Sequence, residues 1–87
     1  MTTRIRLRAA VGEPLGDEGV RAIVVSTARG IGERTGVRVE VIEAALDTIE
    51  LEVEGSNLEA TALAAELRRV TDQWHQQRHG RPLWGEP

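Results

Sequence analysis

The sequence predicts a small α+β domain with the element order β-α-β-β-α, and two patterns lead to this prediction. Apolar and charged residues alternate between residues 37 and 54, which is typical of two strands joined in a hairpin. Apolar residues recur at helical spacing before and after this hairpin, in residues 18–34 and 56–78. A further alternating segment precedes the first helix and supplies the first strand.

Residues 4–11 are expected to form this first strand. Its two faces differ in chemistry, with Ile5, Leu7, Ala9 and Val11 on one and Arg4, Arg6 and Arg8 on the other. The glycine and proline content of residues 12–16 indicates a loop. Asp17 is expected to cap the helix that follows, and Gly36 is expected to end it in a left-handed conformation.

The hairpin supplies the second and third strands, with Asp47 at its turn. Three glutamates face outward on the third strand, namely Glu50, Glu52 and Glu54. Ser56 and Glu59 then fit a capping box at the start of the second helix. This helix is expected to reach about residue 78, and Gly80 stops it.

This element order resembles a ferredoxin-like unit that lacks its last strand. The resemblance implies that both helices cover one face of a three-stranded sheet. The other face carries an arginine row on the first strand and a glutamate row on the third strand. Opposite charges on neighbouring strands attract, so we expect the sheet order 1-3-2, with the first strand as an open edge.

Composition narrows the possible functions. The 87 residues form one domain over residues 1–80, with residues 81–87 as a C-terminal tail. Cysteine, tyrosine and lysine are absent, so thiol and Schiff-base chemistry are excluded and we do not expect an enzyme. The net charge of −3 does not favour nucleic acid, and no apolar run is long enough for a membrane. The expected location is cytoplasmic.

One short motif bears on cofactor binding. Residues 24–32 resemble the glycine-rich nucleotide loop of short-chain dehydrogenases. That loop must open a full helix, whose N-terminus holds the pyrophosphate. Only residues 33–35 follow here before Gly36 and a strand, so we expect no cofactor and interpret the motif as the end of a helix.

The second helix carries one candidate metal site. Asp72, His75 and His79 are spaced by three and four residues, which places them on one helical face. Two histidines and a carboxylate can bind zinc, but the alternative is that these groups simply suit a helix C-terminus, and we expect this alternative and no bound metal. The arginines nearby form a basic patch that indicates either nucleic-acid binding or a solvated helix face, and we expect the second: Arg68, Arg69, Arg78 and Arg81.

The tail is the most unusual segment of the chain. Leu83 and Trp84 follow a helix stop, where a tail is ordinarily polar, and an apolar pair of this size is costly to leave in water. These two residues therefore either cover the core of their own domain or dock on another chain. Trp74 continues the apolar stripe of the second helix and is expected in the core.

These observations lead to a function hypothesis. We expect a non-enzymatic accessory module that forms a homodimer or binds a larger protein through the first strand, the tail or both. The residues involved would be Arg4, Arg6, Arg8, Leu83 and Trp84. The alternative is a small-ligand sensor similar to the ACT type, because residues 12–16 follow the first strand where such domains bind effectors. A metal-dependent or carboxylate enzyme is the third hypothesis.

Overall fold

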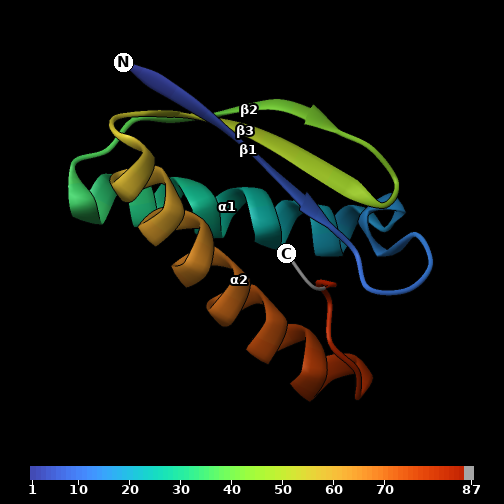
Figure 1. Cartoon of the computed structure of the whole chain (residues 1–87). Helices are drawn as coiled ribbons and strands as arrows, with labels where there is room; N and C mark the ends of the chain where they lie inside the picture. The colour runs from blue at the N-terminus through green and yellow to red at the C-terminus, as the bar shows by residue number, and fades with distance from the viewer. Residues whose placement is uncertain (86–87) are drawn as a thin grey trace.

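The computed structural model describes residues 1–85, and its element order confirms β-α-β-β-α (Figure 1). A short 3-10 turn, η1, is the one element that the sequence did not indicate. The element bounds are β1 Thr2–Arg8, η1 Pro14–Gly16, α1 Glu18–Thr35, β2 Val39–Ala44, β3 Thr48–Glu54 and α2 Asn57–His79.

The three strands form one antiparallel sheet in the order β1-β3-β2, as the charge rows predicted. Arg4 lies opposite Glu52 and Arg6 opposite Glu50, with ion pairs of 3.7 and 3.8 Å. Only two of the three arginines of β1 face a glutamate, because the register places Arg8 opposite Thr48. The third glutamate of the row, Glu54, pairs instead with Arg38 at 3.8 Å.

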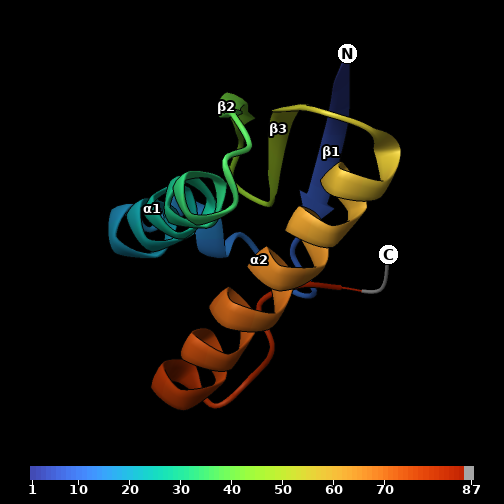
Figure 2. The same ribbon diagram turned by 90° about the vertical axis from the view of Figure 1, so that its left-hand side faces the viewer.

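Both helices cover the same face of the sheet (Figures 1 and 2). The Asp17 carboxylate accepts hydrogen bonds from the N–H groups of Gly19 and Val20 at the start of α1. The capping box between Ser56 and Glu59 is present at the start of α2. Gly36 and Gly80 end the helices with φ angles of 72° and 73°, a conformation that glycine adopts without strain.

The core lies between the sheet and the helices. It is built from the inward-facing residues of β1 and β3, the apolar stripes of α1 and α2, and residues from two connecting segments. Its main large side chains are Leu7, Leu15, Val24, Ile31, Ile49, Leu51, Val53, Leu63, Leu67, Leu83 and Trp84. Trp74 is only partly buried and packs against this cluster from its margin.

The first strand ends earlier than the sequence predicted. It stops at Arg8, and Val11 is 72% exposed, not part of the apolar face. The reason is its partner, because β3 begins at Thr48 and only one hydrogen bond joins the two chain segments beyond that point. The Ala9 N–H still donates to the Asp47 carbonyl at 2.8 Å, and Gly12 then turns the chain with a φ of 71°.

The loop of residues 12–16 is packed against the domain. It contains η1, and Leu15 within it is fully buried. The Leu15 N–H donates to the Leu46 carbonyl at 2.9 Å, which fixes the loop to the β2–β3 turn. None of the helices described for residues 1–85 is both long and apolar enough to cross a lipid bilayer.

Candidate functional site

The chain after α2 returns to the sheet and lies against β1. Ala9 and Trp84 form a single antiparallel bridge. The Ala10 N–H donates to the Leu83 carbonyl and the Gly85 N–H donates to the Arg8 carbonyl, both at 2.9 Å. In a β-α-β-β-α-β chain the last strand follows the second helix, and here one bridge occupies that place in the sequence.

Four side chains of α2 form hydrogen bonds with this returning segment, namely Arg68, Thr71, Asp72 and His75. One carboxylate oxygen of Asp72 accepts hydrogen bonds from the N–H groups of Leu83, at 2.6 Å, and Trp84, at 3.3 Å. The indole N–H of Trp84 donates to the Thr71 hydroxyl at 2.8 Å, and this hydroxyl donates to the Leu67 carbonyl at 2.6 Å. The tail is therefore fixed by hydrogen bonds as well as by burial.

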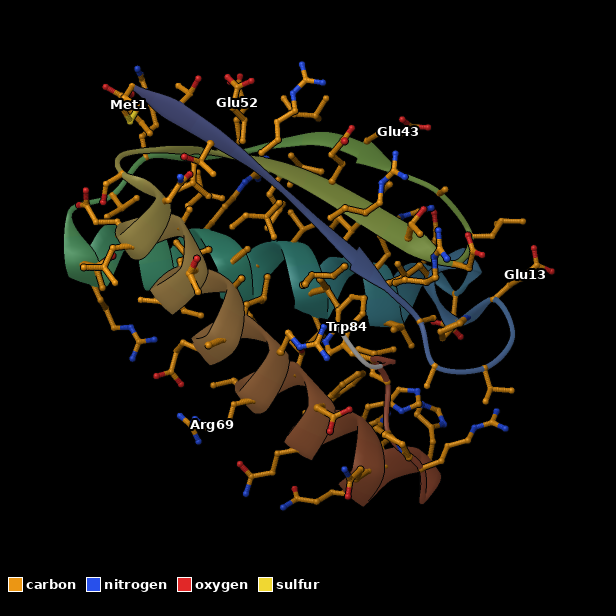
Figure 3. The ribbon with its side chains drawn as sticks, in the orientation of Figure 1. Met1, Glu13, Glu43, Glu52, Arg69 and Trp84 are labelled. Atoms are coloured by element: carbon orange, nitrogen blue, oxygen red, sulfur yellow. The ribbon has the colours of Figure 1, made fainter. Side chains whose placement is uncertain are left out.

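This packing shows whether Leu83 and Trp84 cover their own domain or are free to dock on another chain. Leu83 is 1% exposed and Trp84 is 6% exposed, and Figure 3 shows Trp84 beneath the end of β1. Of the two possibilities, covering the domain's own core is the one observed, so these side chains are not available as a docking anchor in this conformation. The remaining tail residues, 86 and 87, lie outside the described residues.

The three metal candidates do not converge on one point. Asp72 accepts the tail N–H groups, and the buried His75 places its Nδ1 atom 2.8 Å from the Arg81 carbonyl. His79 is exposed, with its ring centroid 4.5 Å from that of His75. Within residues 1–85 no group of three histidine, cysteine, aspartate or glutamate side chains has the geometry to hold a metal ion.

The other short motifs also lie in ordinary structural positions. Residues 24–32 belong entirely to α1, as the helix-end interpretation predicted. Two arginines of the basic patch have partners, because Arg68 donates to the Gly85 carbonyl and Arg69 pairs with Glu66. Sequence reasoning did not single out Thr71, although it continues the i, i+4 spacing of Leu63 and Leu67.

Up to Gly85, the tail pairs with only the last residues of β1 and the residues that follow it. Backbone groups of an antiparallel strand point alternately to one neighbour and to the other. Met1 and Ala9 pair towards β3, so Thr2, Arg4 and Arg6 direct their N–H and C=O groups away from it. Within residues 1–85 no other backbone group meets them. We call this segment, residues 2–6, the free edge of β1.

The opposite edge of the sheet is less regular. The pairing of β2 with β3 shifts between Val41 and Glu43, which leaves Ile42 as a bulge. Bulges of this kind interrupt the backbone pattern that a further strand would need. The free edge of β1 contains no such irregularity.

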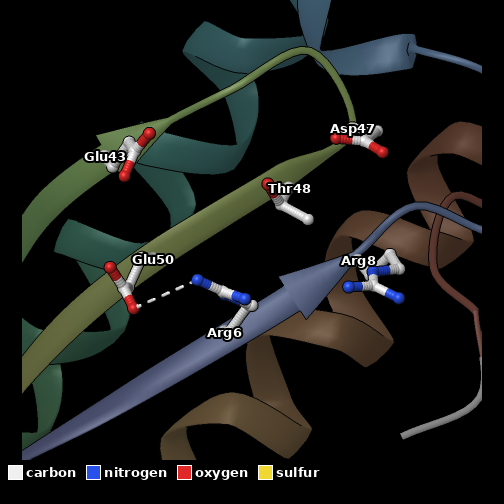
Figure 4. A pocket seen from close by; sticks show the side chains of 6 residues that line it. All are labelled: Arg6, Arg8, Glu43, Asp47, Thr48 and Glu50. Atoms are coloured by element: carbon white, nitrogen blue, oxygen red, sulfur yellow. Dashed lines mark ion pairs between the residues drawn. The ribbon is translucent and has the colours of Figure 1, made fainter.

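A polar hollow of about 210 Å³ lies on the solvent-facing side of the sheet, beside the free edge (Figure 4). Arg6 pairs with Glu50 across it, whereas Arg8 makes no ion pair with any residue in the described range. The other lining residues are Glu43, Asp47 and Thr48. The hollow is open, so it provides charge but little burial for a ligand.

The buried polar groups lie in α2, where it contacts the tail. Among the described residues the only buried polar side chains are Thr71 and His75, and each is bonded to a main-chain carbonyl. Comparison with protein-family models, curated proteins and solved structures found no match to this chain. The case for any function therefore depends on the geometry above.

Proposed function

We propose that this protein is a small non-enzymatic interaction module that takes up an extended segment of a second chain along the free edge of β1. The observation that supports the proposal is the contrast between the two parts of this strand. The tail covers its end at Arg8–Ala10, and within residues 1–85 no backbone group pairs with the outward N–H and C=O groups of Thr2, Arg4 and Arg6. Strand edges of this kind are templates for pairing, and proteins either block them or use them.

The surroundings of the edge favour an added strand. Ile5 is only partly buried and packs against the core from its margin. A neighbouring strand would cover this side chain and would complete the hydrogen bonding of β1. A chain of 87 residues has a small core, so it gains stability from such an association.

A pair of variants at Arg4 tests the proposal. Arg4→Pro removes an N–H that points away from β3, so it blocks an added strand and leaves the β1–β3 ladder intact. Arg4→Ala removes the same charge and keeps the N–H, and it is the matched control. We expect a homodimer or a complex, detected by light scattering, cross-linking or pull-down, that Arg4→Ala retains and Arg4→Pro loses. A monomer at high micromolar concentration with no recovered partner, or a complex that Arg4→Pro retains, would contradict the proposal.

The second candidate function is a small-ligand sensor of the ACT kind, and the polar hollow is the observation that favours it. Arg8 lies there without an ion-pair partner among residues 1–85, beside a strand whose following loop is firmly packed. A thermal-shift screen with amino acids and nucleotides tests this candidate. We expect a shift that Arg8→Gln abolishes, and the absence of a shift with every compound removes the hypothesis.

A further inference from the structure

We infer that the segment taken up by the free edge is acidic at alternate positions, with an apolar residue between them, and that it comes from a different protein and not from a second copy of this chain. This inference rests on the proposed function and identifies the partner's chemistry. Three features lead to it: the side-chain directions along β1, the charges on those side chains, and the pattern on the other strands.

The directions of the side chains along β1 explain why acidic and apolar residues should alternate in the partner segment. Residues directly opposite each other on neighbouring strands place their side chains on the same face of a sheet. The partner residues opposite Arg4 and Arg6 would therefore lie on the solvent-facing side. The residue between them would lie opposite Ile5 on the helix-covered side, where an apolar side chain extends the core.

The charges set the preference for acids. Arg4 and Arg6 already pair with Glu52 and Glu50 on their inner side, yet their side chains remain 64% and 62% exposed. A guanidinium group has five N–H donors, so it can contact a carboxylate on each side. The free edge therefore presents two exposed cations, spaced two residues apart, to any strand that joins it.

A second copy of β1 does not satisfy this pattern. In an antiparallel pair of identical strands, the outward-directed residues of one copy face those of the other. One register places Arg4 against its own counterpart, and the next places Arg4 against Arg6. Either register brings like charges together on neighbouring strands, which is destabilising.

The β2 edge of a second copy is also a poor match. Its outward carboxylates, Glu40 and Glu43, are three residues apart because of the bulge at Ile42. The arginines of the free edge are two residues apart. The strand that does match is β3, where Glu50, Leu51 and Glu52 lie opposite Arg6, Ile5 and Arg4.

The sequence of β3 therefore supplies the probe. An end-capped peptide with the sequence of residues 48–54 carries the acidic-apolar alternation, and a control peptide replaces its three glutamates with glutamines. Each is titrated into the isotopically labelled full chain up to millimolar concentration and followed by amide chemical shifts. We expect the acidic peptide to bind at least ~10-fold more tightly than the control, with the shifts centred on residues 2–7.

Variants of the protein provide the reciprocal test. The double variant Arg4→Gln/Arg6→Gln should lose most of the preference for the acidic peptide. The double variant Arg29→Gln/Arg34→Gln removes two exposed arginines of α1, away from the edge, and should retain it. The two peptides are compared on the unaltered protein, so the test does not depend on the folding of any variant.

The outcomes separate this inference from the proposed function. Equal binding of both peptides at residues 2–7 would overturn the acidic preference and leave strand addition standing. A homodimer that Arg4→Pro disrupts, with no peptide binding, would also overturn the inference and retain the proposed function. No peptide binding and no complex sensitive to Arg4→Pro would overturn both.

Discussion

Two glycines of α1 differ in how much space their neighbours leave for a side chain. A Cβ atom at Gly32 would lie 2.6 Å from the Val37 carbonyl oxygen and 3.0 Å from a methyl group of Val39. A Cβ atom at Gly30 would meet nothing within 4 Å. Gly32 is therefore needed where the end of α1 approaches the start of β2, and Gly30 is not needed for packing.

These surroundings predict opposite effects of the same substitution. Gly30→Ala should stabilise the protein by about 0.5–1 kcal/mol, because alanine restricts the unfolded chain and favours the helix. Gly32→Ala should destabilise it by about 1–3 kcal/mol, because the new methyl group displaces main-chain atoms. Urea unfolding of both variants measures the difference. Equal effects at the two positions would contradict the close approach of α1 and β2.

The residues of the tail show where sequence reasoning reached its limit. The cost of exposing Leu83 and Trp84 predicted that something covers them. It did not predict what covers them, because the answer depends on a space between β1 and α2 that exists only in the folded chain. Leu15 was missed for a related reason, since one leucine among glycine and proline has no periodicity to reveal its burial.

At the level of elements, the local chemistry of the sequence predicted how the elements are arranged better than it predicted how long they are. The opposite charges of β1 and β3 and the capping residues of both helices are encoded within a few residues of where they act. The end of β1 is set by the point where its partner β3 begins. The sequence of residues 4–11 alone does not carry this information. The free edge follows from the sheet order, but the part that the tail covers does not.

The start of α2 makes a prediction about pH. Hydrogen bonds from the N–H and the hydroxyl of Ser56 favour the charged carboxylate of Glu59 and lower its pKa below the ordinary value of 4.5. Because the pKa is lower in the folded state, the carboxylate stabilises the fold above about pH 4.5, and this contribution is lost as the pH falls through the folded pKa.

We therefore expect the stability of Glu59→Gln to fall less steeply between pH 6 and pH 3 than that of the unaltered protein. Ser56→Ala provides the comparison at neutral pH, where loss of the cap should cost about 1 kcal/mol. Urea midpoints of Glu59→Gln and the unaltered protein, measured across this pH range, test the prediction. Parallel pH profiles for Glu59→Gln and the unaltered protein would show that the carboxylate contributes nothing through this shift.

The C-terminal tail packs against α2 and the end of β1. The C-terminal part of α2 extends away from the sheet (Figures 1 and 2), and the returning tail fills the space beside it. Thr71 and His75 are buried in this part of the helix, and both form hydrogen bonds with the tail. Residues 81–85 therefore pack as one unit with β1 and α2.

This shared packing predicts a single unfolding transition. In a Trp74→Phe variant the remaining tryptophan, Trp84, reports on the tail, and far-UV circular dichroism reports on the helices and the sheet. The two urea transitions should coincide, with a slope of about 1–3 kcal/mol per molar urea, because a small two-state domain unfolds as one unit. A tail that detached first would move the Trp84 transition to a lower urea concentration. Such a separation would show that the hydrogen bonds of Asp72 and Thr71 do not couple the tail to the core, and that the end of β1 is free to pair together with residues 2–6.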